Sequence, residues 1–204
     1  HSLAQGTVVG YDIMSALPDT DVLLKEIPFV RGLEEELLSS YNYYCTYGDR
    51  LNVGPHALIK RSQFHRLLKN ARMLDLHTLR PSDVDVILER RLGKGVTKMN
   101  FDEFIFVLVA TGARRIPTMP WLASFFFTVL SKLLPSSERL AQMHTSGAFS
   151  NGGSMIDVDY WTERELKVKE LRLNLLDPAV MDLFNVVEEQ LQEFESLVSN
   201  ADDK

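Results

Sequence analysis

Apolar residues recur every three or four positions along most of this 204-residue chain, which is the spacing of one buried helix face. Leu37, Tyr41 and Tyr44 keep this spacing in a helix predicted over residues 34–47. We expect strand only as one short residue pair in each loop, so the pattern predicts an all-α fold. Further helices are predicted over 62–74, over 81–93, from Asn100 onwards, over 121–134, after Pro135, over 162–176 and over 178–199.

Two pairs of polar residues indicate where helices begin. The Asn100 side chain can accept a hydrogen bond from the backbone N–H of Glu103, while the Glu103 carboxylate can accept one from the Asn100 amide. Thr162 and Glu165 have the same spacing. We therefore expect helices to begin directly after Asn100 and directly after Thr162.

Breaks in composition divide the chain into five segments. The last helix places apolar residues at alternating spacings of four and three from Val180 to Val198, and this seam is expected to pack within the chain. Because the chain begins at His1 without a methionine, sequence is expected to be missing upstream. The segments are an irregular N-terminal arm (1–33), two helix–loop–helix units (34–115), an apolar helical extension (116–145), a Gly/Ser-containing linker (146–161) and a C-terminal helical hairpin (162–204).

Charge is distributed unevenly along the chain, whose overall net charge is −6. Residues 45–115 carry 13 basic and seven acidic side chains, a net of +6, whereas 1–44 and 116–204 have nets of −5 and −7. A basic middle between acidic flanks indicates either an acidic macromolecular partner or internal docking of the flanks. The acidic pI of about 5.4 argues against nucleic acid, and no nucleic-acid-binding motif is present.

The first loop can be aligned with a calcium-binding EF-hand loop through Ile59 at its eighth position and Gln63 at its twelfth. Positions one, three and five then fall on Asn52, Gly54 and His56. A hard dication needs several charged oxygen ligands, and these residues supply none. We therefore expect no metal in this loop.

The second loop departs further from the ion-binding pattern. With Met99 at the eighth position, positions one, three and five fall on Leu92, Lys94 and Val96, and Glu103 is the twelfth. A cation and two aliphatic side chains in the cage oppose ion binding, so Glu103 is interpreted as a helix cap. The sequence predicts a degenerate EF-hand-like domain over 34–115 that keeps the helices and binds no metal.

Several blocks of this domain resemble one known family. They read YYCTYG (43–48), FHRLLK with MLD (64–69 and 73–75), DVDVIL (83–88) and KGVTKMNFDEF (94–104). In order and spacing these blocks resemble the p25-alpha family, that of the tubulin polymerisation-promoting protein, over about residues 35–115. The resemblance implies a degenerate EF-hand-like helical domain, microtubule association and occurrence in ciliated or flagellated cells.

Motifs of catalysis and of membrane insertion are missing from the sequence. The five histidines have no paired metal-ligand spacing, and Gly93-Lys94-Gly95 lacks the frame of a phosphate-binding loop. The single cysteine, Cys45, lies in an apolar helix stripe, which indicates packing. The most apolar run, 121–134, is too short and too polar to cross a bilayer. We expect no enzyme, no cofactor and no membrane span.

The sequence thus favours a non-enzymatic, microtubule-associated structural protein of the cytoplasm and cytoskeleton, in the axoneme of a cilium or flagellum. Tubulin is the expected partner, and the C-terminal helices are candidates for contacts with other axonemal proteins. Two alternatives stay open: an EF-hand-like adaptor that binds a helical target without calcium, and a small enzyme with an unrecognised site. The residues predicted to contact tubulin are nine of the 13 cations of the basic domain: Lys60, Arg61, Arg66, Lys69, Arg72, Arg90, Arg91, Lys94 and Lys98.

Overall fold

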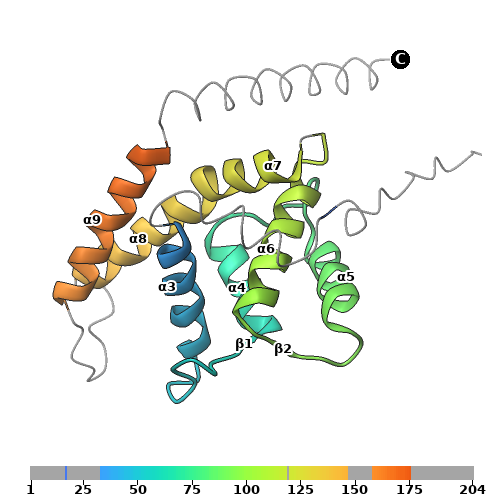
Figure 1. The fold of residues 1–204 in the computed structure, drawn as a ribbon, viewed down its shortest axis with the longest axis horizontal. Helices are drawn as coiled ribbons and strands as arrows, with labels where there is room; N and C mark the ends of the chain where they lie inside the picture. Colours follow the sequence, from blue (N-terminus) through green and yellow to red (C-terminus); the bar gives the residue numbers. More distant parts are fainter. Residues whose placement is uncertain (1–16, 18–32, 119, 147–157, 176–204) are drawn as a thin grey trace, which may run out of the picture.

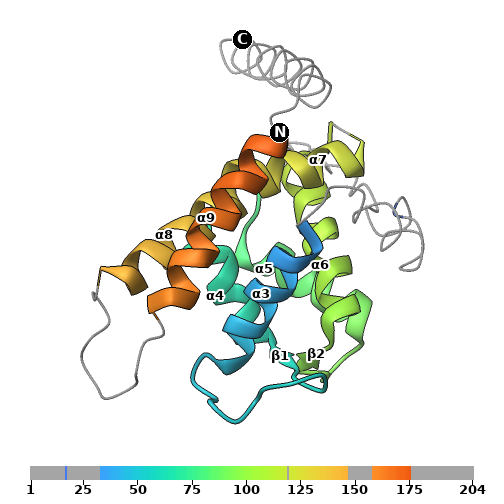
Figure 2. The same ribbon diagram turned by 60° about the vertical axis from the view of Figure 1, so that its left-hand side comes forward.

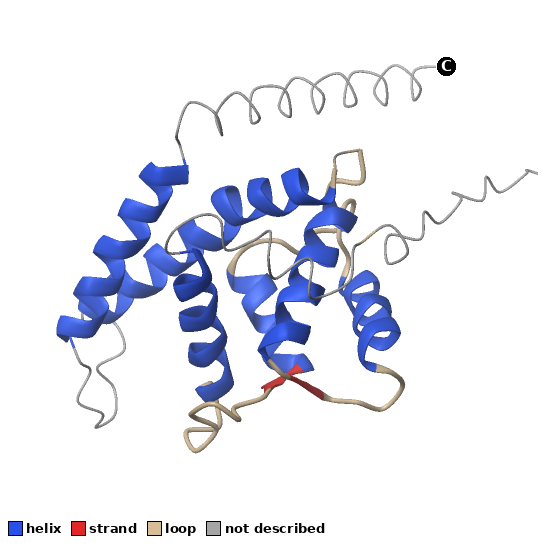
Figure 3. Ribbon diagram, in the orientation of Figure 1, coloured by secondary structure: helices blue, strands red, loops and turns tan. Residues whose placement is uncertain are grey.

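The computed structural model of this chain describes residue 17 and residues 33–118, 120–146 and 158–175 (Figure 1). Most of the predicted N-terminal arm, residues 147–157 of the predicted linker and the predicted helix over 178–199 with its apolar seam lie outside these residues. The described part is mostly helical, with one two-stranded sheet, so the predicted all-α class is confirmed (Figure 3).

Two helix–loop–helix units form the first half of the fold. The first contains α3 (Leu33–Thr46), β1 (Ile59–Lys60) and α4 (Arg61–Asn70). The second contains α5 (Pro81–Leu92), β2 (Lys98–Met99) and α6 (Phe101–Arg115). The two-residue strands pair antiparallel with Ile59 opposite Met99, which are the residues that the EF-hand alignment places at position eight of each loop. The prediction of one short strand in each loop is confirmed, and their pairing with each other is added by the structure.

Helix α4 ends earlier than the predicted helix over 62–74. It stops at Asn70, and Arg72 then takes a positive φ of 54°. This is a left-handed conformation that non-glycine residues adopt at a cost. The predicted stripe still holds, because Phe64, Leu67 and Ala71 are buried.

The start of α6 follows the predicted capping arrangement. The Glu103 amide donates to Asn100 Oδ1 at 2.9 Å, and the Asn100 amide donates to Glu103 Oε2 at 2.9 Å. Because these bonds satisfy amides that the helix leaves unpaired, such a cap contributes about 1 kcal/mol. The interpretation of Glu103 as a capping residue is confirmed.

A single helical rod follows, where the sequence predicted two helices separated at Pro135. Helix α7 (Trp121–Thr128) runs through a π-helical turn (Val129–Leu133) into α8 (Leu134–Thr145). Within the turn, the Leu134 amide donates to Val129 O, five residues back. Proline lacks an N–H and its ring clashes with the carbonyl four residues earlier, so the wider turn accommodates Pro135 without a break.

Helix α9 (Val158–Leu175) packs antiparallel against α8 (Figures 1 and 2). It begins four residues before Thr162, so the predicted helix start at Thr162 is wrong. Glu165 does not cap this helix: it accepts hydrogen bonds from Lys169 at 2.7 Å and from Gln142 of α8 at 3.3 Å. A capping rule considers only the residues at the start of a helix. It therefore could not predict bonds to Lys169, one turn further along, or to Gln142 on α8.

One buried contact between charged groups fixes α9 on α3. Arg164 Nη2 lies 2.9 Å from Glu36 Oε1, and the two side chains are only 5% and 7% exposed. Ser40 joins this pair, since its hydroxyl donates to the same carboxylate at 2.9 Å. Close by, the rings of Trp161 and His144 stack with centroids 4.0 Å apart.

The core runs without interruption from α3 to α9. Phe64 and Phe104 are fully buried at its centre, with ring centroids 5.9 Å apart. Phe125 of α7 and Val168 of α9 belong to the same cluster. Burial of each such side chain contributes about 1.5–3 kcal/mol, so the helices beyond residue 116 stabilise the EF-hand-like units directly. Among the described helices, none combines the length and the apolar character required to cross a bilayer.

Candidate functional site

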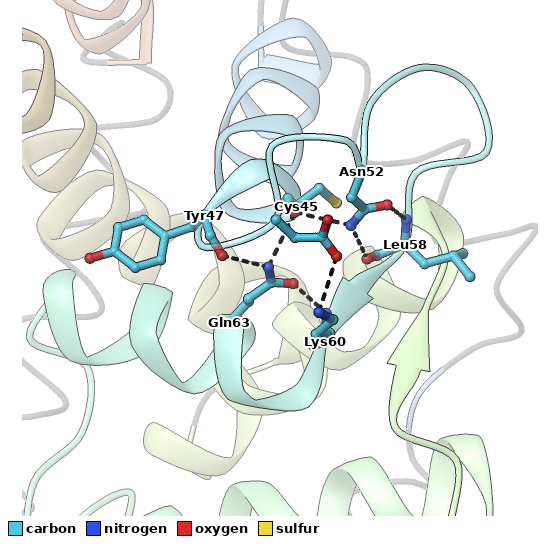
Figure 4. A network of polar contacts seen from close by, with 7 residues as sticks. Cys45, Tyr47, Asn52, Leu58, Lys60 and Gln63 are labelled. Carbon is cyan, nitrogen blue, oxygen red and sulfur yellow. Dashed lines mark hydrogen bonds and ion pairs between the residues drawn. The ribbon is translucent and has the colours of Figure 1, made fainter. Parts of the chain in front are cut away.

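The first loop is held in shape by the side chain of Asn52, at the position where an EF-hand has its first ligand. Its Nδ2 donates to Cys45 O at 3.0 Å and to Leu58 O at 2.7 Å, while its Oδ1 accepts from the Leu58 amide at 3.1 Å (Figure 4). The bond from a backbone N–H fixes the orientation of the amide group, so Nδ2 must face the two carbonyls.

Gln63, at the twelfth position of this loop, repeats the arrangement. Its Oε1 accepts from the Lys60 amide at 2.7 Å, and its Nε2 donates to Cys45 O at 3.1 Å and Tyr47 O at 2.8 Å (Figure 4). The carbonyls of this loop therefore receive amide N–H groups where a calcium loop would offer its oxygens to an ion. The loop closes through neutral hydrogen bonds.

The second loop begins with a glycine conformation, and its own side-chain bonds come at its end, between Asn100 and Glu103. Gly93 directly follows α5 with a φ of 90°, which favours glycine and ends the helix. Lys94, at the third position of the EF-hand alignment, is exposed. Within the described residues, no group of three or more His, Cys, Asp or Glu side chains is placed to hold a metal ion.

The two loops are joined into one rigid end of the domain. The Tyr41 hydroxyl of α3 donates to Ala57 O at 2.6 Å and lies 3.2 Å from Met99 O, so it contacts both loops. The Arg61 amide donates to Thr97 O at 2.9 Å, and Arg61 Nη2 donates to Gly93 O at 3.0 Å. These bonds fix the side chains that the strands present outwards.

Cations gather on the outer face of this end, and we call Lys60, Arg61, Lys94 and Lys98 the loop-end group. Lys60 and Lys98 are directly opposite each other in the strand pair, while their neighbours Ile59 and Met99 point into the core. Like charges in this position destabilise a strand pair. Asp49 offsets part of this repulsion, because it lies 3.1 Å from Lys60 Nζ in an exposed ion pair that contributes less than about 1 kcal/mol.

The other predicted contact residues are placed differently. Arg90 and Arg91 are in the last turn of α5, just before the second loop, and Arg91 stacks over the Phe106 ring at 4.1 Å. Arg66 lies over the Tyr47 ring at 4.2 Å, and Lys69 is exposed on α4. Arg72 lies beyond the opposite end of α4 from Arg61, about 15 Å away along a ten-residue helix. The structure therefore brings only part of the predicted set together.

An apolar groove adjoins the loop-end group. It has a volume of about 710 Å³ and lies between α3, the first loop and the start of α6. Leu38, Tyr41, Leu58, Asn100 and Phe101 are among the residues that line it. Leu58 and Asn100 are neighbours of the paired strands, two residues from Lys60 and Lys98 and on the same outer face by strand alternation.

Three cations that the sequence analysis did not select lie near Arg72. They are Arg115 at the end of α6, Lys132 in the π-helical turn and Arg139 in α8. Charge counted along linear segments missed Lys132 and Arg139 because they belong to the acidic segment 116–204, whereas Arg115 was counted in the basic segment but not assigned a contact. Their proximity is created by the packing of the α7–α8 rod on the first four helices, for which the sequence carries no local signal.

Comparisons of the chain with protein-family models, with curated proteins and with solved structures find no match. The resemblance to the p25-alpha family stays a prediction from the sequence blocks.

Proposed function

We propose that this chain is a non-enzymatic, microtubule-associated structural protein whose loop-end group contacts the acidic surface of tubulin. The observation that carries the proposal is the pairing of Lys60 with Lys98 on the outer face of a strand pair. Like charges that lie opposite each other destabilise the strand pair. An anionic surface laid against them attracts both, and this attraction offsets their mutual repulsion.

The charge of the whole domain supports the same partner. The net of +6 over residues 45–115 gives a field that draws the domain towards an anionic polymer and speeds encounter. Fixed loops add to this effect, because the cations need little ordering when they bind.

The place of action follows from the family resemblance alone. If the chain is a divergent member of the p25-alpha family, it belongs in the cytoplasm, on the cytoskeleton, and specifically in the axoneme of a cilium or flagellum. The helices beyond residue 116 are then available to other axonemal proteins.

Co-sedimentation with microtubules tests the proposal. Lys94→Glu with Lys98→Glu reverses two exposed charges of the loop-end group, and we expect at least a tenfold loss of affinity. The matched control is Lys167→Glu with Lys169→Glu, which makes the same change of charge on exposed positions of α9. Binding of the unaltered chain is expected to weaken steeply as salt rises. Equal losses in the two variants contradict the assignment of the loop-end group.

The groove favours a second candidate, an EF-hand-like adaptor that binds a helical protein target without calcium. Its apolar lining suits the apolar face of a helix. Leu51 and Val53 lie beside it on the first loop and are 92% and 63% exposed. The same pelleting experiment separates the two functions: a folded chain that ignores microtubules even at low ionic strength leaves the adaptor as the remaining proposal.

A further inference from the structure

A second group of cations lies at the end of α4 that is remote from the loop-end group. We call Arg72, Arg115, Lys132 and Arg139 the α4-end cluster. Its members come from four elements: the turn after α4, the last residue of α6, the π-helical turn and α8. Arg139 Nη2 donates to Asn70 O at 3.3 Å, which fixes α8 against the end of α4, two residues before Arg72.

The inner members of the cluster are only partly accessible to water. Arg115 and Lys132 are half-buried, whereas Arg72 and Arg139 are exposed around them. The Arg115 nitrogens Nε and Nη1 are enclosed and have no hydrogen-bond partner among the described residues. A buried polar group of this kind calls for an explanation, and a bound ion is one.

The charges in the cluster act on one another. Burial, followed by the charges of Arg115, Arg72 and Arg139, lowers the pKa of Lys132. The carboxylate of Asp75 opposes this effect. Four cations and one carboxylate leave the cluster strongly positive.

The carboxylate of Asp75 is already occupied by hydrogen bonds within its own turn. It accepts hydrogen bonds from the His77 amide at 2.7 Å, from the Thr78 amide at 2.5 Å and from the Thr78 hydroxyl. Burial alone raises the pKa of Asp75, and these hydrogen bonds outweigh it and bring the value to about 2. Within the described part of the chain, no member of the α4-end cluster forms an ion pair with a carboxylate.

We propose that the α4-end cluster is a binding site for a compact polyphosphate anion. Guanidinium groups match phosphate oxygens with paired N–H donors, and a lysine adds a point charge. Convergence from four elements surrounds a small, multiply charged group better than it follows an extended chain. Arg115 adds its charge from a half-buried position, while Arg72 and Arg139 are exposed to solvent.

A structural role accounts for Arg139 and Arg115, which both lie at the C-terminal end of a helix. Arg139 binds the last carbonyl of α4, where the helix dipole favours a cation. The test therefore leaves Arg139 and the half-buried Arg115 intact and changes Arg72 and Lys132. Arg72→Gln with Lys132→Gln keeps side-chain length roughly constant and removes two charges.

Calorimetric titration of the full chain with pyrophosphate, at constant ionic strength, provides the measurement. We expect binding to the unaltered chain and a loss of about tenfold or more in the Arg72→Gln, Lys132→Gln variant. Lys94→Gln with Lys98→Gln is the matched control, because it removes two charges from the loop-end group, and it should bind as the unaltered chain does. Tricarballylate, a compact tricarboxylate, should bind at least tenfold more weakly than pyrophosphate.

A second readout follows the amine of Lys132 itself. Acetylation mapped by mass spectrometry should slow several-fold at Lys132 when pyrophosphate is present, while acetylation of Lys94 stays unchanged. Absence of binding to the unaltered chain, equal binding by the Arg72→Gln, Lys132→Gln variant, or equal binding of tricarballylate overturns the proposal. If circular dichroism shows that the variant is unfolded, the acetylation of Lys132 in the unaltered chain becomes the deciding measurement. An equal rate of acetylation with and without pyrophosphate then overturns the proposal.

Discussion

Asn52 and Gln63 give the first loop its shape through six hydrogen bonds that involve only neutral groups. Each amide uses its oxygen for a backbone N–H and its nitrogen for two backbone carbonyls. Three of the carbonyl contacts come from α3 or its end, so the pair also ties the loop to the helix before it. Because Cys45 O accepts from both amides, a substitution of Asn52 removes the side-chain donor of Leu58 O, and a substitution of Gln63 removes that of Tyr47 O.

Cys45 provides a prediction at this scale. Burial raises the pKa of its thiol from 9.0 to about 11, although a hydrogen bond with Tyr41 opposes the shift. The folded chain then holds the proton more tightly than the unfolded chain, so the thiol's contribution to stability is complete below about pH 9. That contribution falls between about pH 9 and 11, by up to about 1.4 kcal/mol per pH unit.

Urea unfolding at a series of alkaline pH values measures this effect. Cys45→Ala should lose stability less steeply with pH than the unaltered chain, since the tyrosines contribute to both. Parallel curves for the two proteins would contradict the assignment. A thiol reagent should also react with Cys45 only after unfolding, because the side chain is fully buried.

The sequence could predict the role of a residue only where its partner lies a few positions away in the chain. Glu103 was identifiable as a cap because its partner, Asn100, is three positions away and both hydrogen bonds depend on one helical turn. The roles of Asn52 and Gln63 depend on carbonyls that approach only when the loop closes on α3. Glu36 and Arg164, 128 positions apart, gave no signal at all.

At the scale of elements, α9 depends on the buried pair of Arg164 and Glu36. Arg164→Ala should lower the free energy of unfolding by about 3–5 kcal/mol, because it leaves a buried carboxylate uncompensated. Lys167→Ala is the matched control on the same helix: its ion pair with Glu163 is exposed and screened by solvent, so the loss should be far smaller. Chemical denaturation measures both, and similar losses would show that α9 is held by other contacts.

The contact between α6 and α7 is set by Gly112. A Cβ at this position would lie 3.4 Å from Phe125 Cα and 3.5 Å from Ser124 O. We expect Gly112→Ala to change stability by less than about 1 kcal/mol, because helix propensity offsets the tight fit. Gly112→Val should cost about 1–3 kcal/mol, since its methyl groups must push the helices apart. Thermal unfolding compares the two, and a tolerated valine would argue against close packing here.

The positions of several helices were predicted well, whereas the connections between helices beyond residue 116 were not. Periodicity located α3, α5 and α6 to within a few residues because each has a clear buried face. The rod from α7 to α8 was divided at Pro135 because a rule for α-helices does not foresee a π-helical turn. The early start of α9 arises from packing on α3 and α8, which local sequence does not encode.

On the scale of the whole molecule, one core spans segments that the sequence divided. Phe64, Phe125 and Val168 belong to one buried cluster although they lie in different predicted segments. The glycine break at Gly93 coincides with the end of α5, whereas the proline break at Pro135 falls inside a continuous helical rod. Such breaks could not reveal that the helices on both sides share a core, because contacts between distant positions leave no trace in local composition.

A shared core predicts one cooperative unfolding transition for the described helices. Trp121 in α7 and Trp161 in α9 can report it separately in the Trp161→Phe and Trp121→Phe variants. In each variant the fluorescence midpoint in urea should coincide with the midpoint from far-UV circular dichroism. An earlier fluorescence transition for Trp161 would mean that α9 detaches before the rest unfolds.

The loop closed by Asn52 and Gln63 has one more consequence. Ion-gated helix pairs change their opening angle with every calcium pulse, because the ion is part of the hinge. Here the corresponding atoms belong to the chain itself, so the spacing between Lys60 and Lys98 should be identical in resting and stimulated cells. For the proposed structural role on a microtubule, this constancy would keep the contacts with the polymer unchanged by calcium.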